Sequence, residues 1–486
     1  MNLVRTRIAP SPTGYIHIGT LRTALYCYFL AKQHDGQFLI RIEDTDQERL
    51  ITGAIENLLK TFQDLGIEHD EGPVLHADGS LSEKGDHGPY VQSQRLALYQ
   101  EYVAALLASG HAYYCFCTKE RLDEMRTSQR ATKQTPRYDR TCCKLSDEEV
   151  QSNLEEGIDH VVRMKVPEGR TEFEDVIRGK LVFDNTEVDD QVLMKSDGYP
   201  TYHLAVVVDD HFMNITHILR GEEWISSTPK HVMLYEMFGW QTPSFAHLPL
   251  LLNPDKSKLS KRQGDVAVED YLKRGYLPEA LINFVSLLGF NPKGDQELYS
   301  VEELIKLFDL EKVNKSGAVL NMDKLDWMNQ HYINELERSE LIKAVRPFLQ
   351  ADVDSDRVQR ALIVERSRVH RLTEFQDKIE EYITEPAFDP SVLVWKKSDT
   401  KDAKEQLTNI LSVLQDFSED DLSTVETIEK RIKTYIANNA LQNGNVLWPL
   451  RTALSGKEQS ASPFECIWVL GKEESLRRVT TAINLL

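Results

Sequence analysis

The stretch APSPTGYIHIGT, residues 9–20, stands between a run typical of a β-strand and a run typical of a helix. Its prolines fix the chain where it leaves the strand, and Gly14 and Gly19 keep side chains out of the turn. Such a turn lets backbone N–H groups and the positive end of a helix approach a phosphate. His17, at the start of the helix, can hydrogen-bond a phosphoryl oxygen. The alternative is an ordinary turn with an incidental histidine.

The segments around this turn predict a parallel sheet. LVRTRIA at 3–9 and FLIRIE at 38–43 have strand character, whereas 18–33 and 54–67 have the apolar spacing of helices. This alternation predicts a doubly wound α/β domain.

The α/β pattern is interrupted and then resumes. Glycine- and histidine-rich turns break it at 72–90, and a mixed segment follows to about residue 190. A β-rich stretch at 199–212, YPTYHLAVVVDDHF, and a helix at 226–238 return to α/β character. The simplest architecture is a nucleotide-binding sheet split by an inserted domain.

The C-terminal third has a helical texture from about residue 326 onward. Residues 331–486 contain only three glycines, and periodic apolar positions alternate with charged faces. In SPFECIWVLG, Ser462 is the expected N-cap of a helix, Glu465 completes a capping box and Gly471 stops the helix. The pattern predicts an all-helical domain.

Size and composition bound the class of protein. The 486 residues predict two to four domains, and 41% apolar and 28% charged residues suit a soluble protein. We expect no membrane span and no targeting signal. Four of the six cysteines fall in one short window, which is not a disulfide framework in so large a chain. The cysteine usage therefore predicts a reducing, cytoplasmic compartment.

Charge alone does not decide whether the protein binds nucleic acid. The net charge of −20 argues against it. Residues 126–144, however, carry six Lys or Arg side chains against the single acid Asp139, and local basic faces bind polyanions. A solvated surface loop has the same composition, so both interpretations stay open.

A second motif, KLSKR at 258–262, follows a strand-like run and a polar loop. Lys258 and Lys261 flank Ser260, and a mobile loop with two lysines can close over a triphosphate and neutralise charge in the transition state. Lysine- and serine-containing loops are common on surfaces. The order of the motifs, histidine turn first and lysine loop about 240 residues later, favours one nucleotide site.

HIGT at 17–20 and KLSKR resemble the two signature motifs of class I aminoacyl-tRNA synthetases. Further motifs, in the order that the family has them, are similar to those of the bacterial-type glutamyl-tRNA synthetases. The resemblance covers essentially the whole chain. These motifs are TRIAPSPTGYIHIGT (6–20), RIEDTD (41–46), GPYVQSQR (88–95), SDGYPTYHLA (196–205), LRGEEWISSTPKH (219–231) and NPDKSKLSKRQGD (253–265), with LWPLRTALSG and SPFECIWVLGKEESLRR near the C-terminus.

The resemblance implies ATP-dependent ligation of L-glutamate to the 3′ end of tRNA(Glu) in two steps. The α-carboxylate of glutamate would displace pyrophosphate to give glutamyl-adenylate, and the acyl group would then pass to tRNA with release of AMP. ATP would enter with Mg²⁺, and His17, Lys258 and Lys261 would stabilise charge on its phosphates. The ATP site implied by the resemblance consists of Gly14, His17, Gly19, Thr20, Glu223, Leu251, Lys258, Ser260 and Lys261.

The resemblance also implies a glutamate pocket. Arg7 and Arg220 would bind the carboxylates, Glu43 the ammonium group and Tyr202 the side-chain carboxylate. Position 206 is valine where better-known members carry a polar residue, often asparagine, so Arg7 and Tyr202 would have to suffice there. Taken singly, RIEDTD is also compatible with a capped turn. The implied pocket consists of Arg7, Ala9, Ser11, Glu43, Tyr202, Arg220 and Trp224.

The implied organisation is a monomer with five segments. Segments 1–80 and 191–252 are the halves of a Rossmann catalytic domain, and an inserted acceptor-stem-binding domain at 81–190 separates them. A stem-contact region with the lysine motif occupies 253–325, and a helical anticodon-binding domain occupies 326–486.

A cysteine cluster raises the question of structural zinc. Members of the family that bind zinc have CxC, a similar gap, and then CxH or another fourth ligand. Here Cys115 and Cys117 are followed by Cys142 and Cys143, and Lys144 stands in place of the histidine. Four thiolates would suit zinc, although adjacent cysteines chelate one ion awkwardly. Bound zinc and no zinc both stay open.

Arg366 and Arg368, in RSRVHRLTEF, fall in what resembles the loop near the third anticodon base. They predict an enzyme that charges tRNA(Glu) alone; the alternative charges tRNA(Gln) as well. Glutaminyl-tRNA synthetase shares the catalytic words but has β-barrels in place of the helical tail. The short paralogue that modifies a queuosine base lacks a C-terminal domain, and an inactive RNA-binding relative would be expected to lose His17, Lys261 or Arg7.

Overall fold

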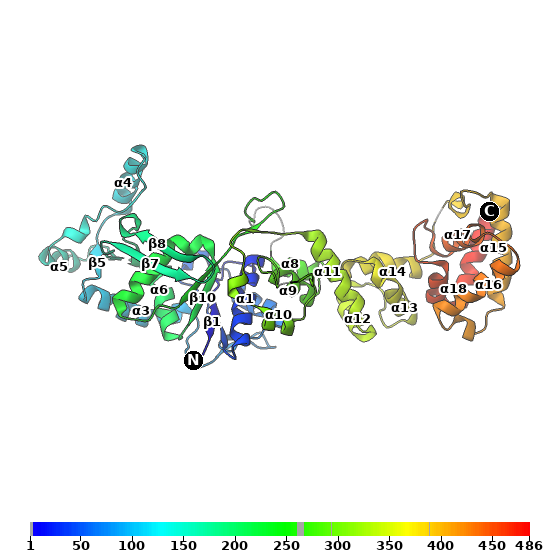
Figure 1. Cartoon of the computed structure of the whole chain (residues 1–486), viewed down its shortest axis with the longest axis horizontal. Helices are drawn as coiled ribbons and strands as arrows, with labels where there is room; N and C mark the ends of the chain where they lie inside the picture. Colours follow the sequence, from blue (N-terminus) through cyan, green and yellow to red (C-terminus); the bar gives the residue numbers. More distant parts are fainter. Residues whose placement is uncertain (1–2, 260–266, 293, 388) are drawn as a thin grey trace. The chain divides into compact units, whose positions relative to one another are not determined.

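The computed structural model describes residues 3–259, 267–292, 294–387 and 389–486. Ser260 and Lys261 of the lysine motif lie outside the described residues. The chain divides into two compact units, whose elements are labelled in Figure 1. The first unit is Met1–Tyr271 with Leu281–Asn321, and the second is Leu272–Ala280 with Met322–Leu486.

The first unit mixes strands and helices. Its strands are β1 (Arg5–Ile8), β2 (Gln37–Ile40), β3 (Gly72–Leu75), β4 (Leu81–Lys84), β5 (Ala112–Cys115), β6 (Val161–Met164), β7 (Arg170–Asp175), β8 (Gly179–Asp184), β9 (Val192–Met194), β10 (His217–Gly221), β11 (Ser244–Leu248), β12 (Leu251–Leu252) and β13 (Ala318–Val319). Its helices are α1 (Ile18–Gln33), α2 (Ala54–Asp64), α3 (Leu96–Ala108), α4 (Lys119–Ala131), α5 (Asp147–Glu155), α6 (Tyr202–Phe212), α7 (Thr228–Phe238) and α10 (Val301–Leu307). The residues of α8 (Val268–Lys273) and α9 (Pro278–Ser286) are divided between the two units.

Parallel strand pairs bring two arginines to one edge of the fold. β1 pairs in parallel with β2, and β10 with β11. The backbone N–H of Thr216, directly before β10, donates to the carbonyl of Arg5 in β1 at 3.0 Å, so these strands lie side by side. Arg7 lies near the end of β1 and Arg220 near the end of β10, and both guanidinium groups lie near Tyr202. The α/β fold expected from the sequence is confirmed.

One predicted element has a different structure. The stretch at 199–212, expected to be β-rich, forms helix α6 from Tyr202 to Phe212. Its valine run 206–208 favours a strand by propensity, but every residue from 204 to 210 is buried, so the run fills the core as a helix. A segment buried on most sides shows no amphipathic period, and helix and strand then look alike in sequence.

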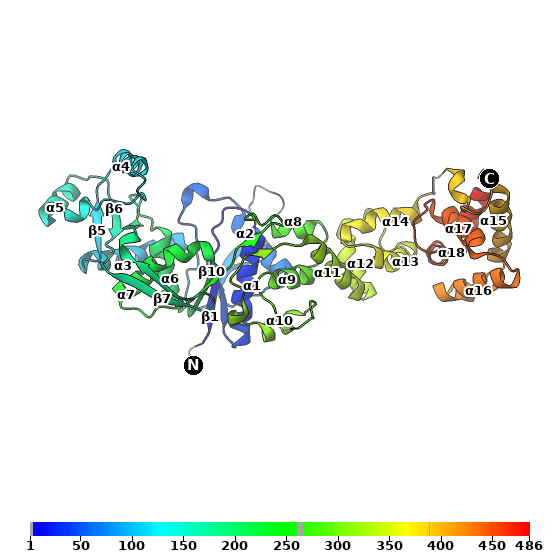
Figure 2. The ribbon, with the colours of Figure 1, turned by 45° about the horizontal axis from the view of Figure 1, so that its top comes forward.

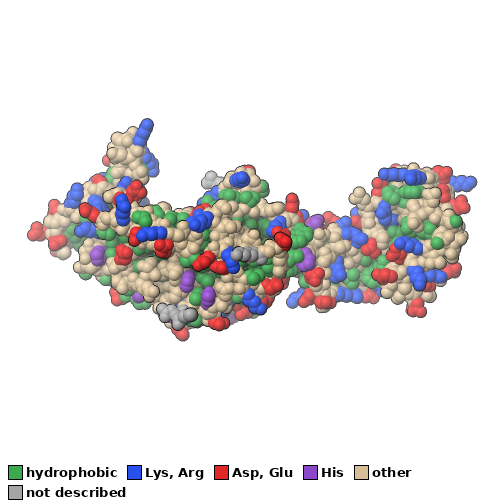
Figure 3. Space-filling view, viewed as in Figure 1, with side chains coloured by type: hydrophobic (Ala, Val, Ile, Leu, Met, Phe, Trp, Pro, Cys, Tyr) green, Lys and Arg blue, Asp and Glu red, His purple; other side chains and the backbone are tan. Residues whose placement is uncertain are grey.

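The segment expected to be an inserted domain has two parts. β5, β6 and β9 form an antiparallel sheet close to α4 and α5 (Figure 2). β7 and β8 pair with each other, and β7 joins β11 where Asp175 lies opposite Phe245. The second part therefore shares a sheet with the strand that carries Arg220. Figure 3 shows Lys and Arg side chains on the projecting part that carries α4.

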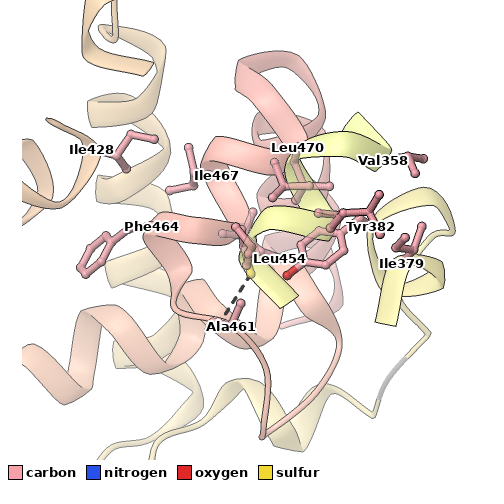
Figure 4. Close-up of a cluster of buried hydrophobic side chains, with 14 of the residues drawn as sticks. Val358, Ile379, Tyr382, Ile428, Leu454, Ala461, Phe464, Ile467 and Leu470 are labelled. Carbon is pink, nitrogen blue, oxygen red and sulfur yellow. Dashed lines mark hydrogen bonds between the residues drawn. The ribbon is translucent and has the colours of Figure 1, made fainter. Parts of the chain in front are cut away.

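The second unit is helical, as predicted. Many of its buried apolar side chains belong to one hydrophobic cluster, part of which is drawn in Figure 4, where Val358, Tyr382 and Leu470 converge from different helices. None of the helices among the described residues of the chain is both long and apolar enough to cross a membrane. The helices are α11 (Met322–Glu335), α12 (Arg338–Val345), α13 (Asp356–Glu365), α14 (Phe375–Ile383), α15 (Thr400–Gln415), α16 (Val425–Asn438), α17 (Asn443–Ser455) and α18 (Pro463–Leu485).

The start of α18 has the capping box read from the sequence. Ser462 Oγ accepts from the backbone N–H of Glu465 at 3.2 Å, and the Glu465 carboxylate accepts from the Ser462 N–H at 2.7 Å. Gly471 has a φ of 75°, so the helical run is broken there, as predicted, and resumes directly afterwards.

Candidate active site

His17 caps α1 and thereby acquires a defined tautomer. Its Nδ1 accepts from the backbone N–H of Gly19 at 2.9 Å, so the proton of the neutral ring is on Nε2. A Cβ atom on Gly19 would lie 3.2 Å from His17 Nδ1 and 3.8 Å from Leu251 Cδ1. Glycine therefore allows the ring and Leu251 to converge at the helix N-terminus. Gly14, with a φ of 136°, lets the preceding turn close.

The described residues on either side of the lysine motif are anchored at this turn. Leu259 donates its backbone N–H to the carbonyl of Leu251 at 3.0 Å, and Ala267 forms a β-bridge with His17. Lys258 is exposed, and its backbone bridges to Leu252. Ala267, the first described residue after 266, thus lies beside the histidine turn, and Leu259 lies against the strand that contains Leu251.

Arg220 is a buried cation surrounded by neutral acceptors. Its Nε donates to His247 Nε2 at 3.1 Å and its Nη2 to Thr228 Oγ1 at 2.7 Å. Its Nη1 donates to the Tyr202 hydroxyl and to His231 Nδ1, both at 3.1 Å. No carboxylate among the described residues forms an ion pair with it.

The histidines around Arg220 accept because they are uncharged. Burial lowers the pKa of His231 far below its usual value, and the positive charge of Arg220 is the second largest cause. Burial also lowers the pKa of His247, although its 2.6 Å contact with Asp175 opposes the shift. Since Nε2 of His247 accepts from Arg220, its Nδ1 carries the proton that Asp175 accepts.

Arg7, in contrast, has an anion of its own. Its Nε and Nη2 donate to the two carboxylate oxygens of Asp210 at 2.9 and 3.1 Å. Arg41 shares Asp210 at 2.7 Å and reaches Glu43 at 3.2 Å. Burial acts to raise the pKa of Asp210, but Arg41 and Arg7 outweigh it and hold that pKa below its ordinary value. Asp209 accepts from Arg95 at 2.7 Å, which extends the group of buried ions.

Tyr202 lies among the residues implied for glutamate. Its hydroxyl accepts from Arg220, and its ring lies 4.5 Å from the Trp224 ring, centroid to centroid. Burial raises the pKa of Tyr202, Arg220 and Arg7 oppose the rise, and Glu43 adds to it. The structure therefore brings Arg7, Glu43, Tyr202, Arg220 and Trp224 together.

The remaining implied residues surround this centre. Glu222, next to the implied Glu223, accepts from the backbone N–H of Leu250 at 3.0 Å, which joins the end of β10 to the strand containing Leu251. Ala9 is half-buried and Ser11 is exposed in the turn after β1, Thr20 lies in the first turn of α1, and Glu223 is exposed in the 3-10 helix η5 (Glu222–Ser227).

Sequence reasoning missed the residues that hold the pocket residues in place. These are Arg41, Asp209, Asp210, Thr228, His231 and His247. One signal was available: two consecutive aspartates directly follow an apolar run in LAVVVDD, and acids in such a position are buried with partners. Nothing comparable marks His231 or His247.

The cysteine cluster differs from the predicted set of ligands. The sulfurs of Cys115, Cys117 and Cys142 all lie within 4.8 Å of one another, with 3.5 Å between Cys117 and Cys142. Cys143 is not in this group. Cys142 and Cys143 are adjacent in the 3-10 helix η3 (Cys142–Lys144), and Cys143 lies near Tyr113 and Arg140. Its role as a fourth ligand stays a prediction.

A tyrosine occupies the fourth side of the cluster. The hydroxyl of Tyr138 lies 3.4 Å from the sulfurs of Cys115 and Cys117. The pKa of Cys115 is lowered, chiefly by its hydrogen bond with Cys142 and less by hydrogen bonds with Tyr138 and Arg163. Three sulfurs and one phenolic oxygen converge there, and cysteine sulfurs are common ligands of zinc.

The two arginines predicted at the anticodon loop lie in the 3-10 helix η8 (Arg366–Arg368) and have different surroundings. Arg368 donates to both carboxylate oxygens of Glu465, at 3.1 and 3.0 Å, and to the carbonyl of Val364 at 2.6 Å. Among the described residues none forms an ion pair with Arg366.

Known proteins resemble the chain over its whole length. A family model described as "tRNA synthetases class I (E and Q), catalytic domain" matches residues 3–327, and one described as "Anticodon binding domain" matches 340–483. A "Glutamate--tRNA ligase" of Clostridioides difficile (strain 630) is 46% identical over 99% of both chains, and one of Clostridium acetobutylicum is 44% identical over 100% of this chain and 99% of its own. The crystal structure of a glutamate tRNA ligase from Elizabethkingia meningosepticum, in complex with its amino acid, has a TM-score of 0.88 and 34% identity over 99% of both chains.

Proposed function

The chain belongs to the glutamate–tRNA ligase family of class I tRNA synthetases, and from that premise we propose how its residues divide the work of charging tRNA with glutamate. The enzyme activates glutamate with ATP and passes the glutamyl group to tRNA. The observation that carries the proposal is Arg220, a buried cation whose protein partners are all neutral.

We propose that the amino acid lies between the two arginines. Arg220 binds one carboxylate together with the hydroxyl proton of Tyr202, which remains available because the hydroxyl oxygen accepts from Arg220. Arg7, already neutralised by Asp210, contributes its remaining N–H donors on Nη1, and Glu43 takes the ammonium group. Glutamine would leave a desolvated guanidinium facing a neutral amide, so selection rests on charge.

ATP is proposed to bind at the N-terminus of α1. The Nε2–H of His17 donates to a phosphoryl oxygen, and the lysines of the KLSKR motif neutralise the departing pyrophosphate. An oxygen of the α-carboxylate attacks the α-phosphorus and pyrophosphate leaves. A ribose hydroxyl of the tRNA then attacks the acyl carbon and AMP leaves. No protein nucleophile is needed, and Mg²⁺ enters with the phosphates.

Zinc is proposed to be held by Cys115, Cys117, Cys142 and the Tyr138 oxygen. The ion is structural: bound there, it ties the end of β5 to η3. Tetrahedral zinc with bonds of about 2.3 Å places its sulfurs about 3.8 Å apart, close to the 3.5 Å between Cys117 and Cys142.

We further propose that tRNA contacts the segments named from the sequence. The segment 81–190 contacts the acceptor stem through its basic run, 253–325 contacts the stem, and the helical segment 326–486 reads the anticodon. The enzyme is proposed to act as a cytoplasmic monomer.

Replacing Arg220 by lysine tests the proposal. Lysine cannot reach four acceptors and a carboxylate at once, so the KM for glutamate in tRNA charging should rise about 10- to 100-fold, with the KM for ATP unchanged. Arg346→Lys, at an exposed pair with Asp354, is the control and should match the wild type. An unaltered KM for glutamate in Arg220→Lys would refute this position of the substrate.

A further inference from the structure

Arg220 and Arg7 are both buried, but the protein treats their charges differently. Arg7 is paired with the Asp210 carboxylate, whereas four N–H donors of Arg220 have neutral partners. A guanidinium has five N–H donors, so one remains. Asp175 lies behind one of these partners, and the imidazole of His247 separates it from Arg220. The site therefore keeps a positive charge that pairs with no carboxylate in the described part of the chain.

His231, like His247, has a second partner that fixes its state, but the second partner of His231 is another imidazole and not a carboxylate. His231 is 1% exposed, and its Nδ1 accepts from Arg220, so its proton lies on Nε2. That nitrogen faces Nδ1 of His203 on α6 at 3.0 Å, which therefore accepts. The hydrogen bonds therefore run in one direction, from Arg220 to His231 and from His231 to His203, and they link β10, α7 and α6.

The surroundings of His231 oppose a second proton. The charged groups that act on it are cationic and come from three elements: Arg220 on β10, Lys230 on its own helix α7, and Arg7 on β1. Its other neighbours are the neutral imidazole of His203 and the Tyr202 ring, 5.6 Å away between centroids. Burial is the largest cause of its lowered pKa, and burial lowers the pKa of His203 to about 3.

We infer that His231 is a positioning residue for the selection of glutamate: as a neutral acceptor locked by His203, it holds the Arg220 guanidinium in place without cancelling its charge. The inference rests on the proposed position of glutamate against Arg220. An anionic partner at this position would orient Arg220 equally well but would remove the demand for a carboxylate on the substrate.

A matched pair of variants separates orientation from charge. His231→Gln keeps a neutral acceptor, and we expect its KM for glutamate to stay within about three-fold of the wild type. The glutamate side chain of His231→Glu has nearly the same shape as the glutamine of His231→Gln but carries a negative charge. We expect it to raise the KM for glutamate about 10- to 100-fold. The preference for glutamate over glutamine should fall by a similar factor, while kcat at saturating glutamate and the KM for ATP stay unchanged.

Two further variants complete the design. His231→Leu removes the acceptor altogether and should raise the KM for glutamate about ten-fold. His217, half-buried on the same strand as Arg220 but bonded to Thr216, supplies the control pair His217→Gln and His217→Glu, both expected to keep the wild-type KM. Thermal melting of each variant identifies any loss of folding.

Three outcomes would overturn the inference. The first is an equal KM for glutamate in His231→Gln and His231→Glu, and the second is a wild-type KM for glutamate in His231→Leu. The third is a fall in kcat together with a rise in the KM for both glutamate and ATP. The Arg220→Lys variant distinguishes a failure of this inference from a failure of the proposed glutamate position. If Arg220→Lys raises the KM for glutamate and the His231 variants do not, only the role of His231 is refuted. If neither affects glutamate, the pocket itself is elsewhere.

Discussion

Asp210 is the residue on which the buried ions most depend. It accepts hydrogen bonds from Arg7 at 2.9 Å and Arg41 at 2.7 Å, and all three side chains are withdrawn from water. Such a pair adds little net stability when complete, but removal of one partner leaves an uncompensated charge in the core. The same carboxylate sets the orientation of Arg7 toward the proposed pocket.

Asp210→Asn should therefore destabilise the protein by about 3–5 kcal/mol, because the buried Arg7 loses its carboxylate partner and Arg41 loses one of its carboxylates. Urea denaturation monitored by circular dichroism measures the change in the free energy of unfolding of the first unit. The KM for glutamate should rise as well, since Arg7 loses its bidentate partner.

Asp354→Asn provides the matched comparison for this experiment. It makes the same chemical change at a pair with Arg346 in which both side chains are exposed. Exposed pairs contribute less than about 1 kcal/mol, so this variant should unfold like the wild type. Comparable stability of the two variants would show that the buried ions do not depend on Asp210.

At the scale of elements, α6 shows how far sequence reasoning reached. The turn before α1, the strands β1 and β2 and the capping box of α18 follow from local chemistry, and the structure has them. Helix α6 was mistaken for β-structure because its burial erases the amphipathic period and its valines favour strands. Its placement depends on packing against α7, which no local pattern encodes.

The site divides in the same way. Arg7, Glu43, Tyr202 and Arg220 could be named because they lie in recognisable words of the sequence. His231 and His247 come together only because α7 and β11 meet Arg220 in three dimensions. The spacing of the cysteines gives the number of candidate ligands but not which sulfurs converge, and the structure brings together those of Cys115, Cys117 and Cys142.

The element formed by β5, η3 and α4 supplies the prediction for zinc. Protein purified without chelator should hold about one zinc ion per chain, measured by elemental analysis. Cys142→Ala should lose most of the metal, because it removes one of three converging sulfurs. Tyr138→Phe, without the fourth donor, should bind the metal more weakly.

Cys143→Ala is the control beside it in the sequence and should retain full zinc, since its sulfur lies outside the group. A metal-free wild type, or equal losses from Cys142→Ala and Cys143→Ala, would contradict the proposed ligand set. Metal removal should also lower the melting temperature of the wild type more than that of Cys142→Ala.

At the scale of the whole molecule, the active site and the predicted anticodon contacts belong to different compact units. The two arginines of η8 are not equivalent. Arg368 is occupied by Glu465 and the carbonyl of Val364, whereas Arg366 has no ion-pair partner among the described residues. Arg366 is the better placed of the two to contact a base.

We predict that the wild type charges tRNA(Glu) and not tRNA(Gln). Arg366→Ala should lower kcat/KM for tRNA(Glu) about ten-fold, because one base contact is lost, while the KM for glutamate stays constant. Charging assays with the two tRNAs side by side give both quantities.

Arg368→Ala is the comparison in the same helical turn. It should reduce the stability of the second unit through the lost contacts with Glu465, with a smaller effect on the choice of tRNA. Similar charging of both tRNAs by the wild type would contradict the predicted discrimination.

The shared Asp210 carboxylate has a practical consequence for directed evolution. It joins chain segments that are 203 and 169 residues away from it in sequence, so a library that randomises Arg7 or Arg41 alone would be dominated by clones that fail to fold. Redesign of the amino acid preference is better begun with apolar substitutions of similar volume at Val206, a buried residue one helical turn from Tyr202, because such exchanges cost a core little.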